Sequence, residues 1–157
     1  MLDLDKIDKK ILSLLQRDAS LNAADIAERI NLSQSPCWRR INRLQEQGYI
    51  RKRVALLDAE KLGMDLVVFI TVSLSAHGRQ SLETFEDHIR QYPEVTECYT
   101  ITGGMDYMIK TQTRDMHHFE QFIRHELAKM ESVRELHSYV AVTEIKQTTE
   151  IDLDSLG

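Results

Sequence analysis

The sequence has few of the features that mark several large classes of protein. Only two of its 157 residues are cysteines, Cys37 and Cys98, and they form no recognisable disulfide framework. No apolar run is long enough to span a membrane, and the opening Met-Leu-Asp-Leu-Asp is too acidic for a secretory signal. We therefore expect a cytoplasmic protein.

Signatures of catalysis and of metal binding are also missing. The sequence contains no nucleophile elbow, phosphate-binding loop, zinc signature or dinucleotide fingerprint. Its histidines lack the spacing, and the supporting carboxylate or cysteine, of a metal site. We expect a protein that is not an enzyme and that holds neither a metal nor a cofactor.

The net charge of −5 conceals two parts of opposite sign. Residues 1–53 carry 11 Lys and Arg against 7 Asp and Glu, whereas residues 54–157 carry 9 against 18. Within residues 34–53 there are six basic residues and one acidic residue. The first third of the chain is therefore suited to approach a polyanion, and the remainder is not.

The most informative stretch runs from Ser33 to Gly48, where the sequence predicts a helix over residues 34–47. Ser33 suits the N-cap, Pro36 falls in the first turn, and Gly48 follows the last turn. The apolar side chains of this helix share one face, and Cys37 is expected in the core. The arginines fall on the opposite face and its flanks, where a guanidinium group can bind phosphate or the edge of guanine.

Two more helices are predicted before this one. Asp5 can cap a helix over residues 6–17, and Asn22 can cap a short helix over residues 23–30, each with one apolar face. Two short helices, a tight turn and a basic helix form the helix-turn-helix arrangement, which binds DNA. Helices this short are unstable alone in water, so the three are expected to share a core.

The basic helix supplies the candidate contacts to DNA. We expect Arg39, Arg43 and Ser35 to face bases. Nearer the phosphates we expect Arg40, Ser33, Gln34 and residues 51–53. The complete candidate set on this helix is Ser33, Gln34, Ser35, Pro36, Trp38, Arg39, Arg40 and Arg43.

Two features of this region each have two interpretations. Trp38 can stack on a DNA sugar or pack at a helix junction, and packing is the commoner fate of a lone tryptophan. The β-prone run 49–57 carries three consecutive cations, at positions 51–53. These cations either protect a solvated strand edge or contact the DNA backbone beside the helix.

A second domain follows a linker at residues 58–65, in which Gly63 ends a short helical turn. The pattern beyond it predicts strand, helix, strand, strand, helix and strand. These elements are expected at residues 66–74, 81–92, 95–102, 105–113, 116–130 and 133–145. This order is the split βαβ of ferredoxin-like domains, here a four-stranded antiparallel sheet with both helices on one face.

The other face of that sheet needs a cover. Residues 66–74 are apolar on both alternating faces, which is typical of a strand that is buried on both sides. The simplest cover is the sheet of a second copy, so the sequence predicts a dimer.

A glycine turn in this domain is a candidate site for a small molecule. In Gly103-Gly104-Met105-Asp106-Tyr107 the turn exposes backbone amides, and the carboxylate can accept hydrogen bonds from an ammonium group. A free amino acid needs both functions. The alternative, which is the commoner arrangement, is a hairpin turn in which Asp106 caps its own backbone.

Short motifs are spread over essentially the whole chain. They are Leu4-Asp5-Lys6-Ile7-Asp8, Leu32-Ser33-Gln34-Ser35-Pro36-Cys37, Arg43-Leu44 with Gly48-Tyr49-Ile50, Ala55-Leu56-Leu57-Asp58, and the glycine turn. Together and in this order they resemble the Lrp/AsnC family, the leucine-responsive or feast/famine transcription regulators. The sequence departs from the family pattern at Gly104-Met105 and at Glu131-Ser132.

The resemblance implies an α+β chain of two domains. An AsnC-type helix-turn-helix DNA-binding domain is expected over residues 3–57, with the helix-turn-helix itself at about 22–41. A ferredoxin-like (ACT-like) βαββαβ domain for amino-acid sensing and oligomerisation is expected over residues 66–148. In the family, sensing domains pair through their sheets, dimers often assemble into octamers, and effector amino acids bind between sensing domains near the glycine turn.

The resemblance also implies effector-binding residues. Carried over by position, they are Gly103, Met105, Asp106, Ala128, Tyr139, Val140 and Ala141. The run Cys37-Trp38-Arg39-Arg40 is similar to that of a subgroup whose members regulate the breakdown of particular amino acids, including sulfur-containing ones.

The sequence therefore predicts a sequence-specific transcription regulator of amino-acid metabolism genes. It is expected to bind double-stranded DNA as a homo-oligomer, to respond to a small amino acid, and to have no membrane partner. One alternative is an architectural DNA-binding protein of low specificity. The other is an amino-acid-binding regulatory subunit of an enzyme, against which the basic segment 34–53 argues.

Overall fold

The computed structural model describes residues 4–75 and 79–156, and the chain divides into two compact units. One unit contains the described residues up to Leu56 together with those from Lys146 onward, and the other is Leu57–Ile145. Residues 146–148, which were expected in the second domain, thus lie with the first unit.

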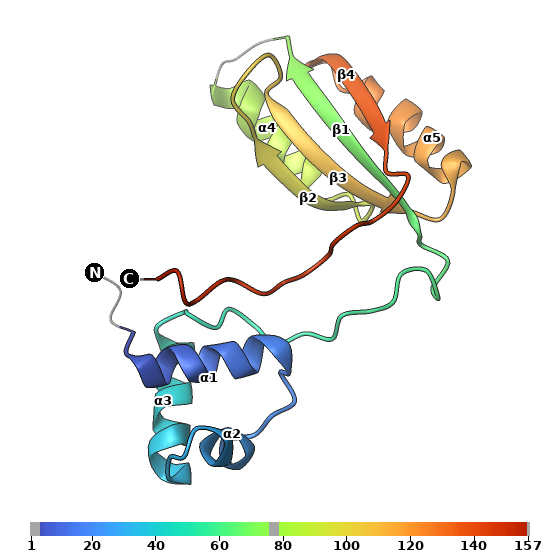
Figure 1. Cartoon of the computed structure of the whole chain (residues 1–157). Helices are drawn as coiled ribbons and strands as arrows, with labels where there is room; N and C mark the ends of the chain where they lie inside the picture. The colour runs from blue at the N-terminus through green and yellow to red at the C-terminus, as the bar shows by residue number, and fades with distance from the viewer. Residues whose placement is uncertain (1–3, 76–78, 157) are drawn as a thin grey trace. The chain divides into compact units, whose positions relative to one another are not determined.

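Three helices form the first unit (Figure 1). They are α1 (Lys6–Arg17), α2 (Ala23–Arg29) and α3 (Gln34–Glu46). Asp5 caps α1 and Asn22 caps α2, and each cap is a capping box in which a carboxylate three residues later accepts from the backbone N–H of the cap residue. The shared core consists of Ile11, Leu15, Leu21, Ile26, Ala27, Cys37, Ile41 and Leu44. The predicted helices and the buried position of Cys37 are therefore confirmed.

Residues in the left-handed conformation end both α2 and α3. They are Asn31, with φ 53°, and Gly48, with φ 77°. After each of them the next backbone N–H donates to the carbonyl five residues earlier, at 2.9 Å after α2 and 3.0 Å after α3. This is the Schellman pattern of helix termination. It fixes the tight turn between α2 and α3 and confirms Gly48 as the residue that ends α3.

The run 49–57 does not form the strand that its composition suggested. In the described part of the first unit there is no strand at all, and residues 51–57 are exposed. A strand requires a hydrogen-bonded partner, and β-prone residues alone do not supply one. Arg53, one of the three cations, donates to the carbonyl of Ala19 at 3.3 Å.

The C-terminal segment of the first unit lies against α1. The Gln16 side chain donates to the carbonyl of Ile151 at 3.1 Å and accepts from the N–H of the same residue at 3.0 Å. Arg17 pairs with Glu150 at 3.0 Å, and Lys9 donates to the carbonyl of Leu156. The first unit therefore contains segments from both ends of the chain.

The second unit is a four-stranded antiparallel sheet with the strand order β2-β3-β1-β4 (Figure 1). Its elements are β1 (Leu66–Leu74), α4 (Arg79–Ile89), β2 (Val95–Thr100), β3 (Tyr107–Thr113), α5 (Met116–His125), the 3₁₀ turn η1 (Leu127–Lys129) and β4 (Val133–Val140). This is the predicted βαββαβ order, and the α+β fold class is confirmed.

Four predicted elements of the second unit were too long at their C-terminal ends. The strand expected at residues 95–102 ends at Thr100. The first helix ends at Ile89 rather than at residue 92, and the second ends at His125, after which the chain continues in η1. The last strand ends at Val140 rather than at residue 145. Its partner β1 begins at Leu66, and Val140 pairs with Val68. Only Leu66 and Val67 lie beyond this pair, which is too few partner residues for a strand that reaches residue 145.

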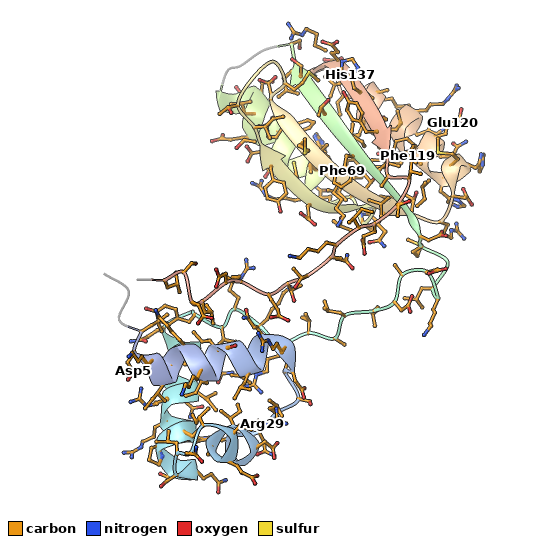
Figure 2. All side chains as sticks on the ribbon, in the orientation of Figure 1. Asp5, Arg29, Phe69, Phe119, Glu120 and His137 are labelled. Atoms are coloured by element: carbon orange, nitrogen blue, oxygen red, sulfur yellow. The ribbon has the colours of Figure 1, made fainter. Side chains whose placement is uncertain are left out.

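Both helices cover one face of the sheet, behind it in the view of Figure 1. The core between them contains Val68, Ile70, Val72, Leu74, Phe85, Ile89, Tyr107, Ile109, Phe119, Phe122 and Leu127. Phe119 belongs to this core, whereas Phe69 projects from the opposite face of β1 and is 37% exposed (Figure 2). The prediction of a strand buried on both faces holds for residues 70–74 but not for Phe69.

Among the helices of the described chain, none is both long and apolar enough to cross a membrane. The same residues contain no cluster of histidine, cysteine and carboxylate side chains that could hold a metal ion.

Candidate DNA interface and effector site

The outward face of α3 carries part of the predicted DNA-contacting set. Ser33, Gln34, Ser35 and Arg39 are exposed, and Pro36 is half-buried in the first turn. Ser33 stands at the N-cap, but its hydroxyl makes no capping hydrogen bond within the described structure. Its backbone conformation therefore starts the helix while the side chain faces outward.

Two of the three arginines on α3 bind acidic residues of α1. Arg40 Nη1 donates to Asp5 Oδ2 at 2.7 Å and to Asp8 Oδ1 at 2.9 Å. Arg43 Nη2 donates to the other carboxylate oxygen of Asp8. Residues three apart lie on the same side of a helix, so a single carboxylate can reach both guanidinium groups. The sequence predicted that Arg43 points away from the apolar face of α3. In the structure its guanidinium turns toward α1 and binds Asp8.

Asp8 is the buried centre of this cluster. Its side chain is 1% exposed, and it also accepts from the backbone N–H of Asp5 at 3.3 Å. The backbone N–H of Asp8 and the guanidinium of Arg40 hold the pKa of Asp5 below its ordinary value. The bonds to Asp5 and Asp8 raise the pKa of Arg40. The two arginines and two aspartates thus form a charge-neutral group.

Trp38 does not pack at a helix junction. Its side chain is 56% exposed, so the commoner of the two interpretations was wrong. It borders an open groove of about 370 Å³ between the start of α2 and the side of α3. The groove is lined by Leu21, Asn22, Ala23, Trp38, Ile41, Asn42, Gln45 and Arg53.

The glycine turn joins β2 to β3 and is tied to the central strand β1. Gly103 has φ 120°, a conformation that residues with a Cβ rarely adopt. The backbone N–H of Asp106 donates to Val72 at 2.9 Å, and its carboxylate accepts from the N–H of Leu74 at 2.7 Å. The carboxylate of Asp106 therefore caps the neighbouring strand β1.

The hydroxyl of Ser73 extends this network toward β4. Ser73 Oγ donates to Asp106 Oδ2 at 3.3 Å and accepts from Arg134 Nη2 at 2.7 Å. Ser73 is 2% exposed, whereas Arg134 is exposed. The site thus has a carboxylate, a hydroxyl and a guanidinium at one end of the sheet.

The other predicted effector residues lie elsewhere. Tyr139 pairs with Phe69, Val140 pairs with Val68, and the N–H of Ala141 donates to Val67. These partners are residues 67–69 of β1, whereas Asp106 bonds to residues 72–74 of the same strand. At 3.3 Å per residue, the two groups of contacts are about 16 Å apart along β1. Ala128 is exposed in η1. The structure therefore brings Gly103, Met105 and Asp106 together and separates Tyr139, Val140 and Ala141 from them within one chain.

A hollow of about 510 Å³ lies between α4 and β2. Tyr107 lines it and donates to Glu86 at 3.1 Å, and Glu86 also pairs with Arg90 at 2.9 Å. Burial, together with the negative charge of Glu86, raises the pKa of Tyr107 to about 12.

Asp8, Ser73 and Arg134 were not among the predicted site residues. The capping box, an aspartate three residues after Asp5, was visible in the sequence. The contacts of Asp8 with α3 were not, because they depend on how two helices pack. Ser73 lies in a strand pattern that reads only as apolar core, and its pairing with Arg134 depends on a bulge between β1 and β4.

Comparisons with known proteins match both units. Residues 67–151 match the Lrp/AsnC ligand binding domain, and residues 4–51 match a winged helix-turn-helix DNA-binding family. The DNA-binding transcriptional activator DecR of Escherichia coli K12 is 34% identical over 151 residues, which cover 96% of this chain and 99% of that protein.

Two solved structures are similar over almost the whole chain. The transcriptional regulator NMB0573 from Neisseria meningitidis, in complex with L-Met, is 36% identical with a TM-score of 0.92, over 96% of this chain and 97% of that one. An AsnC family transcriptional regulator from Agrobacterium tumefaciens is 38% identical with a TM-score of 0.93, over 98% and 99%. The family matches of the two units and the relatives that cover almost the whole chain all point to the same family. The chain belongs to the Lrp/AsnC family of DNA-binding transcription regulators and is not an enzyme.

Proposed function

We propose that the chain recognises a specific DNA sequence through α3, and that a small amino acid bound to the second unit changes this recognition. The observation that carries the proposal is the exposed N-terminal half of α3. There Ser33, Gln34, Ser35 and Arg39 project outward from a buried apolar face. In helix-turn-helix proteins, the N-terminal residues of the second helix contact base edges in the major groove. We place this activity in the cytoplasm, at genes of amino-acid metabolism.

Methionine is the first effector to test. The relative from Neisseria meningitidis was crystallised with L-Met and is 36% identical to this chain. The glycine turn also offers backbone amides and a carboxylate for the two charged ends of a free amino acid.

We propose that two copies of the chain build the effector site. In one copy the glycine turn and Tyr139–Ala141 lie at opposite ends of β1. A second copy can bring one group against the other. The open face of the sheet carries Phe69, Tyr99, Met108 and Tyr139, all of which are exposed, and it suits pairing with another sheet. A dimer with two α3 helices would bind a roughly palindromic site.

DNA binding tests the first part of the proposal. The purified protein is titrated with DNA from upstream of its own gene and with a scrambled DNA of equal length, at physiological salt. Each titration is repeated with L-methionine, with L-leucine and with a mixture of common amino acids. We expect tight and selective binding that at least one amino acid shifts.

The other outcomes separate the alternatives. Selective binding that no amino acid shifts would leave the DNA-recognition proposal and contradict the effector proposal. Equal binding to both DNAs would favour an architectural role, and no binding to either would favour action on a protein partner. Light scattering at micromolar protein tests the dimer, and a strictly monomeric species would contradict the shared effector site.

A further inference from the structure

We infer that Asp8 is a specificity-determining residue: it withholds Arg40 and Arg43 from DNA, so that α3 reads DNA with Arg39. The inference rests on the proposed placement of α3 on DNA. It changes the role that the sequence alone suggested for Arg43, from a base contact to a surface charge paired with the buried carboxylate of Asp8.

The geometry of Asp8 supports this role. Each of its two carboxylate oxygens binds a different arginine, and its side chain is 1% exposed. A phosphate that attracted either guanidinium would have to compete with this carboxylate. Removing an arginine from the cluster leaves a buried negative charge with fewer partners, which is strongly unfavourable. The two arginines are therefore held in place when DNA approaches.

The remaining charges are distributed differently. Arg39 is exposed, and within the described chain it has no ion-pair partner. Of the six cations in residues 34–53, two are neutralised by Asp5 and Asp8, and the other four pair with no acid among residues 4–75 and 79–156. Cations near phosphates increase affinity for every DNA sequence, whereas selectivity comes from base edges and DNA shape. Neutralising two of the six thus limits non-specific binding.

The test is the substitution Asp8→Asn, which removes the charge but keeps an oxygen that can accept the N–H of Asp5. It releases Arg43, while Arg40 keeps Asp5. Each additional phosphate contact steepens the plot of log K against log salt by about 0.9 and strengthens binding about fivefold at 0.15 M salt. We expect this change on scrambled DNA, and a ratio of specific to non-specific affinity that falls by up to about fivefold.

Asp25→Asn is the matched control. Asp25 occupies the corresponding position in the capping box of α2 and accepts from the N–H of Asn22 at 3.0 Å. Within the described residues it has no ion pair with an arginine. Both variants remove one negative charge from the same unit. A steeper salt dependence in Asp8→Asn alone supports the inference. Equal changes in both variants, or none in Asp8→Asn, would overturn it.

A second variant applies if Asp8→Asn does not fold, as judged by circular dichroism and thermal unfolding. Arg43→Gln should leave the salt dependence unchanged if Asp8 holds this arginine away from DNA. A slope reduced by about 0.9 would show that Arg43 binds a phosphate and would overturn the inference. Arg39→Gln should instead lower the ratio of specific to non-specific affinity, because Arg39 is the arginine that reads the bases. Failure of the wild type to distinguish specific from scrambled DNA would contradict the proposed function, whereas the salt slopes on scrambled DNA would still test Asp8.

Discussion

Replacing Asp106 by alanine should destabilise the second unit before it affects any ligand. The carboxylate accepts a hydrogen bond from the backbone N–H of Leu74 at 2.7 Å and a longer one, at 3.3 Å, from Ser73. Leu74 is a fully buried residue of β1. Alanine would leave its N–H without the carboxylate. Loss of a hydrogen bond to a charged group, with one partner left unsatisfied, costs about 1.5–3 kcal/mol.

Scanning calorimetry and hydrogen exchange measure this effect. At about 4–8 °C per kcal/mol for a domain of this size, Asp106→Ala should lower the Tm of the second unit by at least about 6 °C. The amide of Leu74 should also lose protection from exchange. Asp106→Asn keeps an acceptor oxygen, and we expect it to cost about 1 kcal/mol or less. An unchanged Tm together with a protected Leu74 amide in Asp106→Ala would refute the reasoning.

The same pair of variants separates structure from effector binding. Loss of the amino-acid response in Asp106→Ala alone would have a structural explanation, because the turn would no longer be tied to β1. Loss of the response in Asp106→Asn, with the Tm nearly unchanged, would show that the charge is needed by the ligand. The asparagine variant is therefore the informative one for the proposed site.

Three further predictions concern stability and reactivity. Gly48→Ala should lower the free energy of unfolding of the first unit by about 1–2 kcal/mol in urea titrations, because φ is 77° there, and an unchanged midpoint would contradict this. Tyr107 should stabilise the fold below pH 10 and lose that contribution as the pH rises toward about 12, because the tyrosine ionises first in the unfolded chain. The loss of stability over this pH range should be smaller in Tyr107→Phe, as monitored by circular dichroism. Cys98 is exposed and should react with a thiol reagent in the native protein, whereas Cys37 is buried and should react only on unfolding. Rapid labelling of both thiols would be contrary to the structure.

The helices of the first unit could be predicted because local signals and periodicity agree there. Capping residues stand directly before each apolar stripe, and Gly48 stands directly after the last one. The contact of Arg43 with Asp8 could not be predicted in this way. A helical projection shows which face a residue occupies but not that a side chain on its edge reaches a neighbouring helix. Burial of Asp8 results from the packing of α1 on α3 and leaves no periodic signal.

The order of the elements in the second unit was predictable, but several of their ends were not. The apolar stripe of the last helix continues through Leu127 and Met130, although the helix ends at His125 and a 3₁₀ turn follows. Apolar spacing cannot distinguish these two conformations over one turn. The length of β4 is limited by its partner β1, which supplies only Leu66 and Val67 beyond the Val140–Val68 pair; this limit is a property of the pairing and not of the residues at 141–145.

The effector residues carried over by the resemblance show a related limit. A motif shows which positions contribute to a binding site but not whether a single chain supplies all of them. Here the glycine turn and Tyr139–Ala141 are separated along β1, so neither group alone makes the predicted site. The pairing register of β1 provides this information, and the sequence motifs do not contain it.

The contact between α1 and the C-terminal segment was also invisible to sequence patterns, for a physical reason. The amide of Gln16 binds both the N–H and the carbonyl of Ile151, and Lys9 binds a backbone carbonyl. Every residue except proline has both of these backbone groups, so these contacts require no particular side chain in the segment, unlike the pair between Arg17 and Glu150. Because the segment follows β4, the first unit is joined covalently to the second unit through residues 47–65 and again through residues 141–149.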